Sequence, residues 1–282
     1  MKPGLHLNVP AAVYHDDPTE KPSLSSSIAH ILLTQSPLHA WHAHPRLNPK
    51  YQPDHASRFD IGTAAHAMLL EKDQSNIVTL DFDDYRKKDA KAARDAARAA
   101  GKTPILAKHY AACDAMVRAA HNAMDASELA GAFEAGDAEQ TCIWEDGGAL
   151  CRARFDWITV DQRIIIDYKT AENAAPDGFI RRMAGLGYFT QAAFYLRGAR
   201  AVGLNPRFVF MVQEIEPPYA CSFVGLSNAM QEIADAQVDQ ALEIWRGCVT
   251  TGKWPGYPQR VCYAEPTSWQ MSEHEIRLAE AV

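Results

Sequence analysis

The sequence lacks several features that would place it in a class at once. No stretch reaches the roughly 18 apolar residues that a membrane-spanning helix needs, and residues 1–18 contain no hydrophobic signal-peptide segment. No Gly-rich phosphate loop and no internal repeat occur in the 282 residues. These absences exclude a membrane-spanning helix, a P-loop nucleotide site and a repeat architecture, and we expect a cytoplasmic protein without membrane contact.

Cysteine is scarce, and its spacing excludes the common metal and cluster motifs. The six cysteines form no C-x-x-C pair, which argues against a structural zinc or an iron–sulfur cluster. In a cytoplasmic protein we expect reduced core residues rather than disulfides. That expectation includes Cys142 and Cys151, which a hairpin could bring face to face.

Positive charge is also in short supply. The 28 Lys and Arg residues against 35 Asp and Glu residues give a formal net charge of −7, which argues against a general polyanion binder. A local basic patch can still bind phosphate, and bound metal ions would offset part of the acidity. The length allows one large domain or two small ones.

What the sequence does contain is centred on Cys151–Thr170, CRARFDWITVDQRIIIDYKT. Apolar residues alternate with charges, a polar break follows at 161–163, and a β-branched run then leads into Asp167. This pattern predicts two antiparallel strands joined by a tight turn. Asp156 lies on the first strand. Asp167 and Lys169 are two residues apart on the second, so their side chains leave the same face of the sheet.

Two carboxylates and a lysine beside an apolar strand point to metal chemistry. Buried charge is costly unless it is paired or binds a metal, and a divalent cation relieves the repulsion between two carboxylates. Oxygen ligands favour Mg²⁺ or Mn²⁺ over zinc. A lysine beside the metal can hold or deprotonate an attacking water, or stabilise negative charge on a phosphate. A surface hairpin with an Asp–Lys ion pair is the alternative, because D-x-K is a short and common string.

Other candidate residues lie on predicted helices and at a strand end. His66 is on an amphipathic helix, where a structural or exposed histidine competes with a metal-binding or phosphate-binding role. Gln191 and Tyr195 are four residues apart and share one helix face, with a core aromatic as the alternative for Tyr195. Glu139 could be an additional metal carboxylate, although an exposed glutamate at a strand end is the favoured interpretation.

The periodicity and capping signals predict an N-terminal helical region followed by a sheet with flanking helices. Lys and Arg residues make the polar helix 84–100 a candidate DNA-flanking arm, but a solvated helix of mixed charge is favoured. The predicted elements are an extended arm at 1–22, a loop at 44–57, helices at 28–33, 38–43, 58–71, 84–100, 103–125, 179–202, 228–250 and 272–281, and strands at 77–80, 138–145, 149–160, 163–169, 207–212 and 219–224.

Four strings occur in an order that resembles a known superfamily. They are GTAAHAMLLE around His66, CRARFDWI around Asp156, IIIDYKT around Asp167 and Lys169, and QAAFYLRG around Gln191. The set resembles the PD-(D/E)xK nucleases, and more narrowly the RecB-like exonucleases of the exonuclease VIII (RecE) type found in phages and prophages. The segment SLSSSIAHILLTQSPLHAW is also similar to the opening of that family, so the resemblance covers most of residues 20–215.

The resemblance implies a role for each matching residue. Asp156 and Asp167 would bind metal, with the Tyr168 carbonyl as a further ligand, and His66 would bind a second metal or organise the site. Lys169 would orient or activate the nucleophilic water, and Gln191 with Tyr195 would hold the DNA phosphate or strand end. Glu139 is the weakest transfer, because no carboxylate of the family aligns with it clearly.

The fold implied is an α/β (α+β) restriction-endonuclease-like core, with a central mixed sheet flanked by helices. We expect a single nuclease domain over residues 23–255, made of a helical part at 23–132 and a catalytic core at 133–255, followed by a tail at 256–282. The site would hold Mg²⁺, or Mn²⁺, as two ions, and no Ser or Cys nucleophile is indicated, so water would attack directly.

The resemblance further implies an exodeoxyribonuclease that degrades linear double-stranded DNA from 5′ ends. It would leave single strands for an annealing protein in recombination, and it would work as a ring-shaped homo-oligomer. A metal-dependent endonuclease and a catalytically idle DNA-binding protein on the same core are the alternatives. The intact Asp167-x-Lys169 argues against the idle form.

Overall fold

A six-stranded mixed sheet forms the centre of the molecule. The computed structural model describes residues 1–52, 60–71 and 77–280. The strand order is β1-β4-β5-β6-β7-β8, and β6 with β7 is the parallel pair among antiparallel ones. The strands are β1 (Gly4–His6), β4 (Gly136–Asp146), β5 (Ala149–Thr159), β6 (Ile164–Ala171), β7 (Arg207–Glu214) and β8 (Cys221–Val224).

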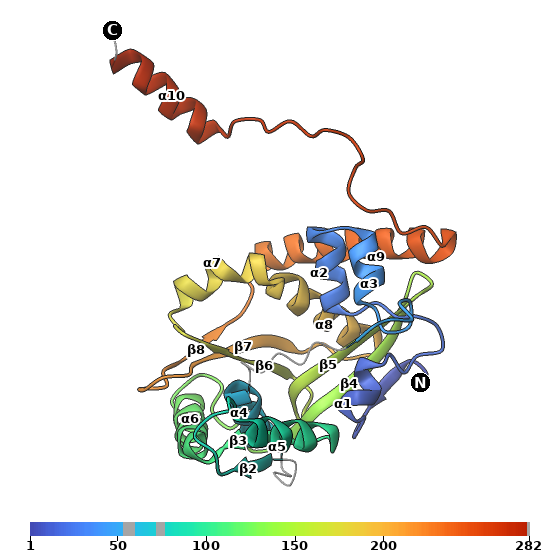
Figure 1. Cartoon of the computed structure of the whole chain (residues 1–282). Helices are drawn as coiled ribbons and strands as arrows, with labels where there is room; N and C mark the ends of the chain where they lie inside the picture. The colour runs from blue at the N-terminus through green and yellow to red at the C-terminus, as the bar shows by residue number, and fades with distance from the viewer. Residues whose placement is uncertain (53–59, 72–76, 281–282) are drawn as a thin grey trace.

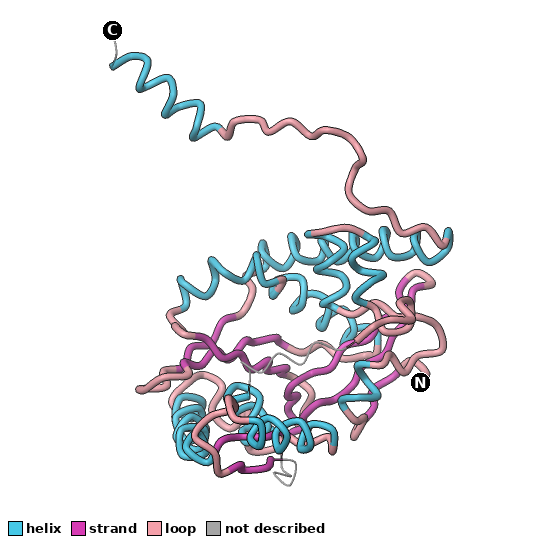
Figure 2. Tube along the Cα trace, viewed as in Figure 1, coloured by secondary structure: helices cyan, strands magenta, loops and turns pink. Residues whose placement is uncertain are grey.

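Helices cover both faces of this sheet, which gives three layers (Figures 1 and 2). One face carries α2 (Ser26–Thr34), α3 (Pro37–Ala43), α7 (Pro176–Leu186), α8 (Tyr188–Ala201) and α9 (Asn228–Thr251). The other carries α4 (Asp60–Leu70), α5 (Lys88–Ala99), α6 (Ala107–Asp125) and a two-stranded parallel ribbon of β2 (Ile77–Leu80) and β3 (Thr103–Leu106). The expected α/β fold, a central mixed sheet flanked by helices, is therefore confirmed.

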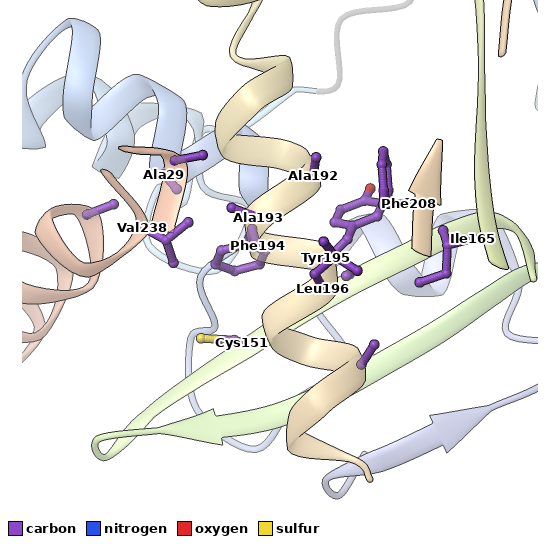
Figure 3. Close-up of a cluster of buried hydrophobic side chains, with 14 of the residues drawn as sticks. Ala29, Cys151, Ile165, Ala192, Ala193, Phe194, Tyr195, Leu196, Phe208 and Val238 are labelled. Atoms are coloured by element: carbon purple, nitrogen blue, oxygen red, sulfur yellow. The ribbon is translucent and has the colours of Figure 1, made fainter. Parts of the chain in front are cut away.

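The larger hydrophobic cluster lies between α8 and the sheet. Figure 3 shows successive α8 residues, Ala192 to Leu196, among side chains from the strands and from α2 and α9. The alanines let α8 approach its neighbours closely, while Phe194 is fully buried and lies 4.9 Å from Trp144 between ring centroids. This packing fixes the position of α8, which also carries Gln191 and Tyr195.

The predicted hairpin is confirmed as β5 and β6. Its turn is closed by Asp161, whose Oδ1 accepts hydrogen bonds from Thr159 Oγ1 at 2.6 Å and from Arg163 N at 3.1 Å. The antiparallel ladder joins Ile158 to Ile165 and Trp157 to Ile166. It stops there, one residue short of Asp156 and Asp167, so the two strands separate where these carboxylates begin.

Residues 1–22 differ from the expected extended arm. Three of them form β1, which pairs with β4 at the edge of the sheet, and α1 (Ala11–His15) follows. The buried Asp17 carboxylate accepts hydrogen bonds from Ser23 N at 2.8 Å and Ser23 Oγ at 2.7 Å. Pairing with a distant strand has no local sequence signal, so the sequence predicts only an extended arm here.

Two predicted helices also have different limits. Thr103-Pro104 does not open a helix: these residues belong to β3, and α6 begins at Ala107. Ile105 and Leu106 are buried there, and tertiary burial outweighs the local helix-start signal. The helix predicted over 179–202 is two helices, because Gly187 adopts a left-handed φ of 74° between α7 and α8.

The remaining predicted elements fall close to the observed ones, with shifts at their ends. Ser25 caps α2, its side chain accepting a hydrogen bond from Ile28 N, and the polar helix begins at Lys88 rather than at 84. The tail contains α10 (Ser268–Glu280). Residues 53–57 of the predicted loop and 58–59 of the predicted helix lie outside the described residues. Among the described helices, none is long and apolar enough to cross a membrane.

Gly198 is expected to be essential for the packing of α8. A Cβ at this position would lie 2.6 Å from Cζ3 of the buried Trp144 ring, so Gly198→Ala should push α8 from β4 and cost about 1–3 kcal/mol of unfolding free energy. The matched control is Gly247→Ala on α9, where nothing lies within 4 Å and alanine should add up to about 1 kcal/mol. Urea denaturation measures both, and equal effects would contradict the packing argument.

Candidate active site

Side chains from α4, β4 and β5 meet where β5 and β6 separate. His66 Nε2 lies 3.4 Å from Asp156 Oδ2 and 3.4 Å from Glu139 Oε1. Asp156 Oδ2 also accepts a hydrogen bond from Tyr168 N at 2.9 Å. The Asp156 carboxylate thus accepts the hydrogen bond that Tyr168 N would donate to a backbone carbonyl of β5 if the ladder continued. This bond holds the separated ends of β5 and β6 in place.

Small residues let α4 come close enough for His66 to reach this point. A Cβ on Gly62 would lie 2.7 Å from Thr170 Oγ1 on β6, and Ala64 and Ala65 are fully buried. The GTAA string before His66 is therefore explained by close helix–strand packing, and the imidazole is carried to the carboxylates as a consequence.

Asp167 and Lys169 form the second half of the site, facing α8. Gln191 Nε2 donates to Asp167 Oδ2 at 2.7 Å, and the Lys169 ammonium is ion-paired with Asp167 Oδ1. That Oδ1 is buried and accepts no hydrogen bond of regular geometry. Lys169 Nζ also lies 5.1 Å from the centre of the Tyr188 ring, which holds the ammonium from the other side.

Glu139 belongs to the same cluster, contrary to the favoured interpretation of an exposed glutamate at a strand end. The pairs Ala138–Trp157 and Gln140–Phe155 keep one register, so Glu139 stands opposite Asp156. Its φ of 56° interrupts the pairing at this point, and its side chain is only 21% exposed. The unusual backbone turns the carboxylate toward His66, which no local sequence signal indicates.

Arg154 holds Glu139 from behind. Its guanidinium is ion-paired with the Glu139 carboxylate and donates to the Val9 carbonyl at 3.2 Å. The Tyr14 ring lies 5.7 Å from the guanidinium carbon. Val9 and Tyr14 therefore support the site through Arg154. No local sequence signal indicates this role for the N-terminal residues or for Arg154.

Comparison with known proteins places this chain in a family. Residues 31–266 match the family described as a PDDEXK-like domain of unknown function (DUF3799). The chain belongs to this family. The expectation of the PD-(D/E)xK superfamily is confirmed by this match. Asp156 lies on β5, and Asp167 and Lys169 lie on β6, on the two strands that the sequence predicted. No curated protein matches the sequence at a significant level.

Solved structures agree on the fold of this PDDEXK-like chain. A proposed exonuclease from Eubacterium rectale aligns with 95% of this chain and 98% of its own at a TM-score of 0.57 and 11% identity. At that identity the likeness shows a shared fold. The structure of SSO0001 aligns with 75% of this chain and 98% of its own at 14% identity, but its TM-score of 0.28 carries no argument.

The charges of the site shift one another strongly. Burial alone would lower the pKa of His66, but Asp156, Glu139 and Asp167 outweigh it and raise that pKa to about 9. Burial and the Asp156 charge raise the pKa of Asp167 to about 7. Burial would also raise the pKa of Asp156, but His66 and Lys169 outweigh it and hold that pKa below its usual range.

Lys169 remains a cation in this environment. Burial works against the ammonium, but the carboxylates of Asp167 and Asp156 outweigh that effect and raise the pKa of Lys169 above its usual value. In the metal-free protein Lys169 is therefore a hydrogen-bond donor rather than a base.

The donor set fits a divalent cation. His66, Glu139 and Asp156 each offer one ligand atom, and these atoms lie within 4.8 Å of one another. Asp167 Oδ1, which is ion-paired with Lys169, is a further acceptor on the neighbouring strand. The carboxylates suit Mg²⁺ or Mn²⁺, whereas the imidazole suits a transition metal better than Mg²⁺. These four residues are the ones that would hold such a cation, and Glu139 is the one that the sequence favoured least.

Tyr195 lies outside the metal cluster, whereas the role of the Tyr168 carbonyl as a metal ligand stays a prediction. The Tyr195 ring packs between Phe155 and Phe208, at 5.6 and 5.9 Å between centroids, and burial raises its pKa well above the usual value. It is a core aromatic near the site, as the alternative held. Tyr168 has its hydroxyl buried, donating to Gln213 Oε1 at 2.5 Å, while its backbone lies beside Asp156.

Metal binding should release protons. Because His66 has a pKa of about 9 and must be neutral to ligate, binding of Mn²⁺ at pH 8 should release about one proton and tighten up to tenfold per pH unit. Below pH 7, Asp167 adds a second proton. Titration calorimetry in two buffers of different ionisation enthalpy counts the protons. In His66→Gln the release at pH 8 should vanish, and an unchanged count would remove His66 from the ligand set.

Proposed function

We propose that this protein is a metal-dependent nuclease that hydrolyses phosphodiester bonds of DNA. One observation carries the proposal: the buried Asp167, its half-buried partner Lys169 and Asp156 meet where two central strands separate, with Gln191 hydrogen-bonded to Asp167. The PDDEXK-like family and the fold shared with a proposed exonuclease support it. Replacing buried charged groups by apolar side chains is often neutral or stabilising, so the fold alone does not require this carboxylate cluster.

The chain's own residues divide the work of hydrolysis. A divalent cation, when bound, supplies stabilisation of the negative charge that gathers on the phosphate in the transition state. Lys169 orients the attacking water or donates to a phosphate oxygen, and its raised pKa keeps it charged for that purpose. Gln191 fixes the orientation of Asp167, and Arg154 fixes that of Glu139.

The finer form of the proposal is an exodeoxyribonuclease acting on linear double-stranded DNA, in the 5′ to 3′ direction and with Mg²⁺. The resemblance to the exonuclease VIII type supports it, together with the recombination role, the annealing-protein partner and the ring that the resemblance implies. An endonuclease on the same core is the alternative, and closed-circular DNA distinguishes the two because it offers no ends.

Lys169→Ala should abolish cleavage while the protein still binds metal. We expect Mg²⁺-dependent digestion of end-labelled linear duplex DNA, inhibited by EDTA, to fall by at least about 10²-fold in the variant. The labelled end that disappears first gives the polarity. Lys253→Ala, an exposed lysine outside the site, is the control and should leave the rate unchanged. Cutting of closed-circular DNA would support the endonuclease, and absence of cleavage with any metal would favour the idle DNA-binding form.

Binding to DNA should depend steeply on salt. With the inactive Lys169→Ala variant, the affinity for a linear duplex should fall at least roughly tenfold between 50 and 200 mM salt, because contacted phosphates release counterions. Fluorescence anisotropy at several salt concentrations gives the slope. A flat dependence would count against a DNA substrate.

A further inference from the structure

Helix α5 and the residues around it carry a surplus of positive charge that the chain as a whole lacks. Residues 84–102 contain seven Lys and Arg residues against three Asp residues, whereas the formal net charge of the chain is −7. A chain of that net charge repels a polyanion, so any binding to DNA needs a local basic surface. The sequence alone favours a solvated helix of mixed charge here, but in the structure the charges are sorted.

The small and the basic side chains of α5 lie along different lines of the helix. The packing line, which is buried or half-buried, repeats at intervals of three and four residues: Ala90, Ala93 and Ala97. The basic line has the same intervals: Lys87 at the N-cap, Lys91, Arg94 and Arg98. Positions three and four residues apart are neighbours on a helix surface. The four cations therefore follow one edge of the packing face, and no carboxylate interrupts them.

Arginines neutralise the carboxylates nearest to this line. Arg86 Nε donates to Asp84 Oδ2 at 2.7 Å, and Arg94 Nε donates to Asp95 Oδ1 at 2.9 Å. Each of these two carboxylates stands four positions from a lysine of α5. A Lys–Asp pair at that separation is a usual ion pair on a helix, but here the arginines already hold both carboxylates.

Three lysines are left without a partner among the described residues. Their side chains make no ion pair and no hydrogen bond there, and all are exposed: Lys87, Lys88 and Lys91. Arginines elsewhere on the surface differ, because Arg197 is paired with Asp146 and Arg207 with Glu128. A lysine is a compact charge on a flexible stem, and several of them in a row suit a phosphate backbone.

These lysines lie in the layer that carries His66. Strand β3 contacts both α4 and α5, and Figure 1 shows the two helices on the same face of the sheet. Packed elements lie about 8–10 Å apart, so two such steps put α5 no more than roughly 20 Å from α4. One strand of a duplex carries a phosphate about every 3.4 Å of its axis, so this distance corresponds to roughly six base pairs. A duplex that runs from the metal cluster across this layer therefore presents phosphates to α5.

We infer that the basic line of α5 binds the phosphate backbone of double-stranded DNA on one side of the bond that is cut, with Lys87, Lys88 and Lys91 as the contacts. The inference rests on the proposed nuclease for its ligand, but it concerns binding and adds no step to hydrolysis. Contacts to phosphates fix the position of a duplex and carry no sequence information, so this surface selects no base sequence.

Replacing two of these lysines should remove two phosphate contacts. Lys87→Gln with Lys91→Gln takes both charges from one line of the helix, and glutamine keeps the helix propensity. In the Lys169→Ala background, the slope of log affinity against log salt should become shallower by roughly 1.8, and the affinity at 100 mM salt should fall at least about tenfold. Fluorescence anisotropy with a linear duplex of about 20 base pairs measures both.

The matched control is Lys2→Gln with Lys253→Gln. It changes the net charge equally at two exposed lysines, one before β1 and one after α9. Its salt slope and affinity should stay close to those of the parent. An equal loss in the control would reduce the effect to net charge and overturn the inference, as would a parent chain that binds no duplex at 50 mM salt.

Cleavage by the same variants with Lys169 intact keeps the inference apart from the proposed function. Lys87→Gln with Lys91→Gln should raise KM for the duplex about tenfold and leave kcat within about twofold, because the lost contacts hold the duplex and not the reacting bond. An unchanged KM and salt slope in a chain that cleaves DNA would overturn the inference and leave the nuclease standing. A shallower slope in a chain that cleaves with no metal would contradict the nuclease and leave α5 as a DNA-binding surface.

Discussion

The structure depends on the balance of charge at the separation of β5 and β6. Three carboxylates, Glu139, Asp156 and Asp167, meet there in a partly buried setting, where two like charges 4 Å apart repel by about 4 kcal/mol at an effective dielectric constant of 20. Three basic side chains face them. The carboxylates raise the pKa of His66 and of Lys169, and the third basic side chain, Arg154, is ion-paired with Glu139. The basic side chains therefore balance the charge of the carboxylates. A cation that binds there displaces protons from this cluster.

The surrounding layers are arranged so that each basic group reaches this point. Gly62 lets α4 approach β6 and deliver His66, while Gly187 ends α7 so that α8 begins at Tyr188 and presents Gln191. On the remaining side of the cluster, Val9 and Tyr14 from the N-terminal part of the chain contact Arg154. Because these groups come from distant parts of the chain, the cluster forms only when both helical layers have packed on the sheet.

The sequence predicts the parts of the site that depend on alternation along one strand. Asp156, Asp167 and Lys169 could be found because a two-residue period fixes their faces, and the hairpin turn has a local signal. Glu139 could not be found in this way, because the direction of its side chain depends on a positive φ and on the register of β4 with β5. The same limit applies to Pro104 and the N-terminal arm, where burial or pairing with distant residues overrides a local preference. Gly187 differs, because a left-handed glycine is itself a local signal for the end of a helix.

The energetics of the cluster argue against a purely structural role. Directly before it, Ile165 and Ile166 fill the two faces of β6 with apolar side chains, and replacing buried ion pairs by such residues is often neutral or stabilising. A protein that needed only the fold could continue this pattern through Asp167 and lose nothing. Instead it keeps a buried carboxyl with a pKa near 7 and an oxygen without a regular hydrogen bond. Such a group is explained by a doubly charged ligand that binds this oxygen, which Lys169 otherwise holds in an ion pair.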